Sequence, residues 1–292
     1  MSDHTRTIRV GSRESRLAVI QAEMVMAAIR RAAPELRLEL VTMKTTGDKI
    51  LDRTLDQVGG KGLFVKELDA ALAEGRVDLT VHSCKDLPME EDPTLPLIAF
   101  SRREDPRDVL VLPAGRSEAD AALPVGCASR RRALQMENLK PGVRVEPVRG
   151  NVQTRLRKLD EGQFSALILA AAGLKRLGLE GRISRYFSPE EMLPAAGQGV
   201  LAVQARAGEN MSFLAGFHDE DTARCVAAER AFVRALDGGC SSPVAAHGVV
   251  ENGTLLLWGM DETGHKARIS GAPDRAKELG GELARRMKEG EI

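Results

Sequence analysis

The sequence predicts an α/β protein with more than one domain. Short β-like runs over residues 8–10, 36–41 and 79–82 alternate with helical patterns over residues 17–32 and 65–73. This βαβ rhythm is typical of sheets with mainly parallel strands. The chain has 292 residues, which is more than one compact domain usually holds. We therefore expect two or three domains, each with its own core, rather than one large domain.

The rest of the chain divides into a second α/β series and a small tail. The second series has β-like runs at residues 97–100, 109–112, 125, 143–148 and 166–170, and residues 200–204 form one more predicted strand. A helix over residues 222–236 then leads to Gly238 and Gly239. Beyond them, three alternating runs within residues 244–270 and a helix over residues 273–288 predict a small α+β domain.

The first predicted helix has an amphipathic pattern. Leu17, Ile20, Met24 and Ala28 recur at spacings of three and four residues. Side chains at this spacing share one face of a helix. We expect these four to form its buried face.

A long polar, glycine-rich stretch separates the predicted strand at residues 36–41 from the predicted helix at residues 65–73. It covers residues 45–62 and ends in Gly59, Gly60, Lys61 and Gly62. Its length and glycine content predict a mobile loop that acts as a lid. It is not a phosphate-binding loop, because Lys61 is followed by glycine instead of serine or threonine.

The composition excludes a strong overall charge. Lysine plus arginine and aspartate plus glutamate both total 42, so the formal net charge is zero. A neutral chain has no uniform field that would attract nucleic acid or an anionic membrane. Any anion-binding site must therefore come from a local cluster. Of the 42 basic residues 31 are arginines, which indicates either recognition of carboxylates and phosphates or a GC-rich genome.

Cysteine usage favours a cytoplasmic protein with reduced thiols. The four cysteines are widely spaced and include no CxxC pair, and no basic and apolar leader precedes the first β-like run. The longest apolar run is about half as long as a membrane helix. The five histidines have no metal-ligand spacing. We expect neither a membrane span nor a metal site.

Arginine recurs where helix physics disfavours it. A helix N-terminus carries partial positive charge and prefers acids, yet basic residues follow three predicted strands. They are Arg13 and Arg16 beside Ser15, Arg130, Arg131 and Arg132 after Ser129, and Arg149 with Arg155. In open α/β sheets such strand-to-helix turns face one crevice, so the pattern predicts a ligand with several carboxylates or phosphates. The alternatives are pairing with surface acids, or a nucleic acid, for which nine aromatic residues leave little base stacking.

Two further positions are chemical candidates. Asp86 follows a predicted strand beside Lys85 and can act as a general acid or stabilise a cation, although an aspartate there is more often a cap or turn residue. His82, on the same strand, is more often structural. Cys240 lies in a Gly-rich turn, where a thiol is accessible to modification or can attack. The other three cysteines fit the commoner role of small buried hydrophobes.

Eight segments resemble signatures of one enzyme family, the porphobilinogen deaminases. They are GSRESRLAVIQA at residues 11–22, GGKGLFVKE at 59–67, VHSCKDLP at 81–88, REDPRD at 103–108, RGNVQTRL at 149–156, AGLKRLG at 172–178, LPAAGQG at 193–199 and GGCSSP at 238–243. They occur in family order along nearly the whole chain. By this resemblance the chain is identified as a member of the family.

The resemblance implies two α/β domains built like periplasmic binding proteins, with a cleft between them, and a small C-terminal α+β domain. The implied boundaries are residues 1–99 with 198–217, residues 100–197 and residues 218–292. The first domain would carry the lid and the catalytic aspartate, the second the arginine-rich half of the cleft, and the third the cofactor cysteine. The implied protein is a cytoplasmic monomer that acts on the small molecule porphobilinogen, without nucleic acid or membrane partners.

The resemblance also implies a role for each site residue. Cys240 would hold a dipyrromethane cofactor through a thioether, and Asp86 would be the catalytic carboxylate. The positions that match cofactor-carboxylate binding are Lys85, Ser129, Arg131 and Arg132. The positions that match binding of substrate or growing chain are Arg13, Ser15, Lys61, Arg149, Arg155 and Arg176, with Lys61 in the mobile loop. The implied reaction joins four porphobilinogen molecules head to tail on the primer and releases ammonia and hydroxymethylbilane.

Two departures from the family pattern limit this assignment. Residues 126–132 read GCASRRR where the family often has GTSSLRR, which leaves the part played by Arg130 open. Cys84 replaces an often larger apolar residue, and its position next to Lys85 and Asp86 suggests a reactive thiol. The alternative function is a non-enzymatic two-domain binding protein for a small polycarboxylate, which has no use for a covalent primer. A cysteine hydrolase is less favoured, because Cys240 has no evident histidine partner.

Overall fold

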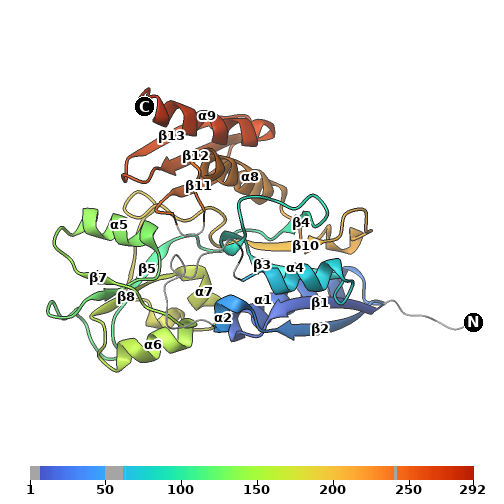
Figure 1. Ribbon diagram of the computed structural model, residues 1–292, viewed down its shortest axis with the longest axis horizontal. Helices are drawn as coiled ribbons and strands as arrows, with labels where there is room; N and C mark the ends of the chain where they lie inside the picture. Colours follow the sequence, from blue (N-terminus) through green and yellow to red (C-terminus); the bar gives the residue numbers. More distant parts are fainter. Residues whose placement is uncertain (1–6, 50–61, 63, 240–241) are drawn as a thin grey trace, which may run out of the picture.

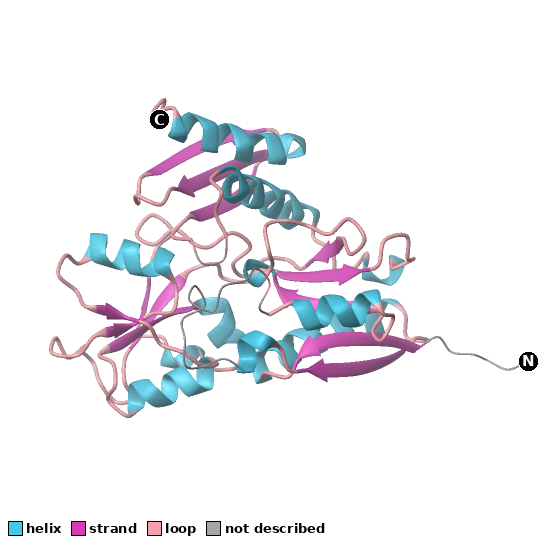
Figure 2. Ribbon diagram, in the orientation of Figure 1, coloured by secondary structure: helices cyan, strands magenta, loops and turns pink. Residues whose placement is uncertain are grey.

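The computed structural model describes residues 7–49, 62, 64–239 and 242–292. Their strands form three sheets, and helices pack against each of them (Figures 1 and 2). Two five-stranded sheets lie side by side, and a three-stranded sheet lies above them in the view of Figure 1. The predicted α/β architecture with a small C-terminal α+β unit is confirmed.

The first sheet has the strand order β2-β1-β3-β10-β4. Its strands are β1 (Thr7–Arg13), β2 (Arg37–Met43), β3 (Leu79–Ser83), β4 (Leu97–Phe100) and β10 (Leu201–Ala205). β1 pairs in parallel with β2 and β3, whereas β10 runs antiparallel between β3 and β4. Its helices are α1 (Arg16–Ala32), α2 (Thr46–Lys49), α4 (Lys66–Ala73) and the 3-10 turn η1 (Cys84–Asp86). An interior position of the sheet is thus taken by a strand that comes late in the sequence.

Helix α1 packs with a different face from the predicted one. Its buried residues include Ala18, Ala22, Val25 and Ile29, whereas Met24 of the predicted face is 45% exposed. Apolar residues occupy most turns of this helix, so several apolar stripes overlap. The small alanines allow close approach to the sheet, and the stripe that contains them is the one that the structure buries.

The second sheet has the strand order β7-β6-β8-β5-β9. Its strands are β5 (Asp108–Val111), β6 (Val125–Gly126), β7 (Val145–Glu146), β8 (Ala166–Ala170) and β9 (Arg185–Tyr186). The helices that follow β6, β7 and β8 are α5 (Arg130–Leu139), α6 (Val152–Asp160) and α7 (Ala171–Arg176). β6 pairs in parallel with β7 and β8, and β5 pairs antiparallel with β8 and β9.

The expectation of mainly parallel strands was wrong. Antiparallel pairings are as frequent as parallel ones in the described parts of the two large sheets. The cause is the path of the chain between them, which leaves the first sheet after β4, enters the second at β5 and returns at β10. Both entering strands run antiparallel to their neighbours.

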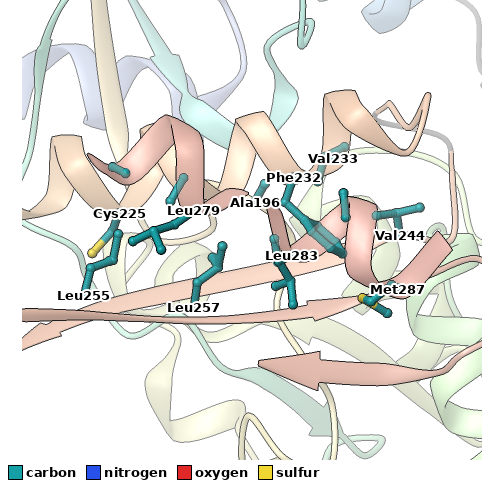
Figure 3. Close-up of a cluster of buried hydrophobic side chains, with 14 of the residues drawn as sticks. Ala196, Cys225, Phe232, Val233, Val244, Leu255, Leu257, Leu279, Leu283 and Met287 are labelled. Atoms are coloured by element: carbon teal, nitrogen blue, oxygen red, sulfur yellow. The ribbon is translucent and has the colours of Figure 1, made fainter. Parts of the chain in front are cut away.

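The third sheet is an antiparallel meander of β11 (Ala245–Glu251), β12 (Thr254–Met260) and β13 (Lys266–Gly271). Helices α8 (Glu220–Ala235) and α9 (Ala276–Lys288) pack against it, and Phe232, Leu257 and Leu283 lie in the core between helices and sheet (Figure 3). Ala196, from the segment before β10, belongs to the same core. The third unit is therefore docked onto a crossing between the first two.

The three sheets take their strands from different stretches of the chain. The first sheet takes its strands from residues 7–100 and 201–205, the second from residues 108–186 and the third from residues 245–271. The exact domain boundaries stay a prediction. Among the described residues, no helix has the length and apolar character needed to cross a membrane.

The contact between α8 and α9 depends on a glycine. A Cβ atom at Gly280 would lie 2.2 Å from the carbonyl oxygen of Ala228, whereas one at Gly281 would meet no atom within 4 Å. We expect Gly280→Ala to lower the free energy of unfolding by about 1–3 kcal/mol, because the helices must separate. Gly281→Ala should raise it by about 0.5–1 kcal/mol, because alanine favours the helix. Urea denaturation of both variants tests this, and equal values would contradict it.

Candidate active site

A cavity lies between the first two sheets. It is lined by parts of α1, β3, η1, α5, α6, β8 and α7, and by Gly197, Gly199 and Val200, which lead back to the first sheet. Four cationic side chains line it, namely Lys85, Arg132, Arg155 and Arg176, and the described lining includes no aspartate or glutamate. We call it the cationic cavity. Within the described residues, no group of histidine, cysteine and acidic side chains is arranged to hold a metal ion.

Lys85 and Asp86 are placed by the turn that ends β3. The amide of Cys84 donates to the carbonyl of Val200 (2.9 Å), which ties this turn to the segment that enters β10. Lys85 lines the cationic cavity, and Asp86 is half-buried next to it. The turn therefore brings a cation and a carboxylate to one edge of the cleft, as the sequence predicts.

The surroundings of Lys85 oppose its protonation. Burial, followed by the positive charge of Arg132, lowers the pKa of Lys85 to about 8. The negative charge of Asp86 acts in the opposite direction on Lys85, and also on Arg132 and Arg155. Asp86 is therefore close enough to interact with the cations of the cavity, although it is not among the lining residues.

Arg131 and Arg132 share a buried carboxylate partner. Both follow Ser129 in the first turn of α5, and both form ion pairs of 2.7 Å with Asp108, which is 0% exposed. Burial alone would raise the pKa of Asp108, but the charges of the two arginines lower it to about 2. Pairing with surface acids is therefore wrong for these two arginines. Arg130 is exposed on the same turn.

Arg155 and Arg176 both line the cavity, and each donates a hydrogen bond to a backbone carbonyl. The Nε of Arg155 donates to the carbonyl of Gly150 (2.7 Å), and an Nη of Arg176 donates to that of Gly199 (2.6 Å). Burial lowers the pKa of both to about 10, and at Arg155 the charges of Arg132 and Arg149 add to the effect. The buried Nε of Arg176 has no hydrogen-bond partner among the described residues. These groups are arranged to receive anionic oxygens.

Six of the described predicted site residues lie outside the lining of the cavity: Asp86, Arg131 and Arg149, and also Ser15, Arg13 and Ser129. Ser15 is the N-cap of α1, and its hydroxyl accepts a hydrogen bond from the amide of Ala18 (3.4 Å). The guanidinium carbon of Arg13 lies 4.2 Å from the centre of the Phe64 ring. Ser129 is the N-cap residue of α5, with no side-chain capping bond. The structure thus gives Ser15 and Arg13 local contacts, and it places none of Ser15, Arg13 and Ser129 in the cavity lining.

Lys61 and Cys240 lie outside the described residues, as does most of the predicted lid. Gly239 and Ser242, on either side of that part of the Gly-rich turn, are joined by a hydrogen bond from the Gly239 amide to the Ser242 hydroxyl (2.8 Å). Cys84 is 1% exposed, and burial raises the pKa of its thiol to about 12. The expectation of a reactive thiol at Cys84 was therefore wrong.

Sequence reasoning missed two buried carboxylates. Asp108 is one, and Glu229 on α8 is the other, with both residues 0% exposed. Glu229 accepts hydrogen bonds from Arg103 (2.6 Å) and from the amides of Gly197 (2.6 Å) and Gly248 (2.7 Å). An acid on the apolar face of a helix is a signal that could have identified Glu229. Asp108 has a weaker signal, as an acid at the start of an apolar strand.

Solved structures that resemble this chain are distant. The effector-binding domain of BenM with its effector benzoate has a TM-score of 0.42 and 17% identity, over 76% of this chain and 92% of that one. The periplasmic aliphatic sulphonate binding protein SsuA from Escherichia coli has a TM-score of 0.41 and 14% identity, over 80% and 71% of the two chains. Scores this low support no inference about this protein.

Comparison with known protein sequences identifies the family of this chain. Residues 8–212 match the family model described as porphobilinogen deaminase, dipyromethane cofactor binding domain, and residues 223–289 match its C-terminal domain. The porphobilinogen deaminase of Ruminiclostridium cellulolyticum is 57% identical over 287 residues, 97% of this chain and 98% of that protein. That of Chromobacterium violaceum is 47% identical over 96% and 94% of the two chains. The chain therefore belongs to the porphobilinogen deaminase family.

Proposed function

We propose that the cationic cavity binds the carboxylates of porphobilinogen and of a dipyrromethane cofactor, and that Asp86 is the catalytic carboxylate. The observation that carries this proposal is a cleft with four cations and no acid in its described lining. As a porphobilinogen deaminase, the enzyme joins four porphobilinogen molecules head to tail and releases ammonia and hydroxymethylbilane. We further propose that it acts as a cytoplasmic monomer.

The residues fit a cofactor of this kind. Each ring of a dipyrromethane carries two carboxylates, for which arginine is the best partner. Lys85, Arg131 and Arg132 would hold these carboxylates, with Ser129 as a hydroxyl donor. Arg155 and Arg176 would hold those of the incoming substrate and the growing chain, with Arg149 beside them. An incoming carboxylate supplies the acceptor that the Nε of Arg176 lacks.

Asp86 would act on the reacting pyrroles. When bound, the dipyrromethane supplies the pyrrole α-carbon to which the next ring is joined. The C–N bond of the substrate aminomethyl group breaks as ammonia leaves, and a positive charge develops on the substrate pyrrole. The carboxylate of Asp86 would stabilise that charge, accept hydrogen bonds from pyrrole N–H groups and take the proton that the α-carbon loses. One carboxylate serves every addition, so the chain must move past it.

The path of the chain supports an inter-domain motion. Two segments connect the first and second sheets, and Ala99 and Gln198 lie near their ends. We infer that rotation about these positions moves the arginines of the second unit relative to Asp86. Ser15 and Arg13, on the first unit, would then meet the growing chain in another arrangement of the cleft. Lys61, outside the described residues, is proposed to belong to the lid.

The role of Asp86 is tested by an isosteric change. Asp86→Asn keeps the shape but removes the charge, so we expect the turnover of porphobilinogen to fall at least about 100-fold. Asp86→Glu keeps the charge at a longer reach and should retain more activity than the asparagine variant. Asp92→Asn, which removes an exposed acid of the same unit, is the matched control and should keep wild-type turnover. Substantial turnover in Asp86→Asn would refute the assigned role.

Attachment of the cofactor to Cys240 is tested by mass. We expect the denatured wild-type protein to carry an excess mass equal to two linked pyrroles, because a thioether survives denaturation. Cys240→Ser should lack this mass, and Cys225→Ser, which changes a buried thiol elsewhere, should keep it. A wild-type protein that gains no such mass on incubation with porphobilinogen would favour a non-enzymatic binding protein.

Because several cations lie close together in the cavity, we predict that Arg155 lowers the stability of the ligand-free protein while it contributes to anion binding. Without its ligands, the protein should gain about 0.5–1 kcal/mol in unfolding free energy from Arg155→Gln, because a half-buried charge among other cations is removed. The same change should at least halve the rise in melting temperature that millimolar phosphate produces. Arg157→Gln, on the exposed side of the same helix, is the control and should retain the full phosphate effect. Thermal melts of the cofactor-free variants measure both quantities.

A further inference from the structure

Asp108 is the centre of a buried polar network next to the cationic cavity. It is the first residue of β5 and is 0% exposed. Its Oδ1 accepts from the Nε of Arg132 (2.9 Å), and its Oδ2 lies 2.7 Å from an Nη of Arg131. One carboxylate therefore contacts both arginines of the first turn of α5.

Backbone acceptors fix the other ends of the two guanidinium groups. Arg131 donates to the carbonyl of Leu193 (2.6 Å), and Arg132 donates to that of Ile168 (3.3 Å). A planar guanidinium held at two points has little freedom to rotate. Asp108 thus determines the direction in which each group presents its remaining N–H donors.

Gln198 extends the network to the first unit. Its Nε2 donates to Asp108 (2.8 Å) and to the carbonyl of Pro106 (2.6 Å), while its Oε1 lies 3.4 Å from an Nη of Arg132 and 3.5 Å from the Nζ of Lys85. The Gln198 side chain therefore links a cation of each unit. This position needs its flanking glycines, because Gly197 and Gly199 have φ of +70° and +86°.

We propose that Asp108, acting with Gln198, is a positioning residue that presents Arg131, Arg132 and Lys85 to the carboxylates of the cofactor. The proposal rests on the function proposed above, in which these three cations bind the cofactor. Asp108 itself has no contact with the ligand. Its role is to keep three donors in one arrangement before the cofactor arrives.

Positioning and simple neutralisation predict opposite outcomes. Removal of the Asp108 charge makes the site more positive, which by itself strengthens attraction for carboxylates. If Asp108 only neutralised excess charge, Asp108→Asn would take up the cofactor at least as fast as the wild type. If it positions the donors, uptake must slow in spite of the added positive charge.

The experiment follows cofactor uptake rather than turnover. Cofactor-free protein is incubated with porphobilinogen, and the appearance of the two-pyrrole mass is measured with time at a temperature where every variant is folded. We expect Asp108→Asn to gain the mass at least about 10-fold more slowly than the wild type. Gln198→Met, which removes the link to Lys85 but keeps the size of the side chain, should be slowed several-fold.

Two controls separate positioning from loss of stability. Gly280→Ala destabilises the contact between α8 and α9, neither of which contributes to the described cavity lining, and it should take up the cofactor at the wild-type rate. Asp105→Asn removes a nearby carboxylate that pairs with Arg107 instead (2.7 Å), and it should also take up the cofactor normally.

Each outcome decides the proposal. Uptake by Asp108→Asn at the wild-type rate or faster overturns it. If Asp108→Asn does not fold, Gln198→Met decides, and uptake equal to that of Asp105→Asn overturns the proposal. A wild type that gains no mass overturns the proposed function itself, which is a different result from normal uptake in the variants.

Discussion

The buried carboxylate of Glu229 joins the three structural units of this protein. From α8 it contacts Arg103 on the segment that leaves the first sheet, the amide of Gly197 on the segment that returns to it, and the amide of Gly248 in β11. All three contacts are 2.7 Å or shorter. One side chain therefore fixes both crossings of the cleft relative to the third sheet, and those crossings connect the two units that line the cationic cavity.

The two buried carboxylates, Glu229 and Asp108, differ in the positive charge that surrounds them. Burial raises the pKa of Glu229, which has a single arginine partner, whereas two arginines lower the pKa of Asp108 to about 2. Asp108 thus stays ionised beside the cavity, and it offsets only part of the positive charge there. Arg155 and Arg176 keep depressed pKa values in the same region. The cleft is built at a cost in electrostatic energy that a bound anionic ligand would relieve.

The sequence predicted the elements better than their pairing. The helices and strands with a clear period were found, and the arginines after β6 were correctly placed in the first turn of a helix. The buried face of α1 was missed because its apolar stripes overlap, and the strand directions were missed because they depend on where the chain crosses between sheets. The contacts of Asp108 and Glu229 could not be predicted, since the position of a single acid in the sequence does not identify its partners, which are as far as 126 residues away.

The late arrival of β10 has a consequence for how the protein is made. During synthesis from the N-terminus, β3 and β4 emerge long before the strand that must lie between them, and the whole second sheet is produced in the interval. Until residues 201–205 leave the ribosome, β3 lacks a neighbour on one side and β4 has no strand to pair with in the first sheet. Such edges favour pairing with other chains and make folding slow. The strands of the second unit come from one continuous stretch of chain, so this unit does not require a later strand and can fold before the first unit is complete.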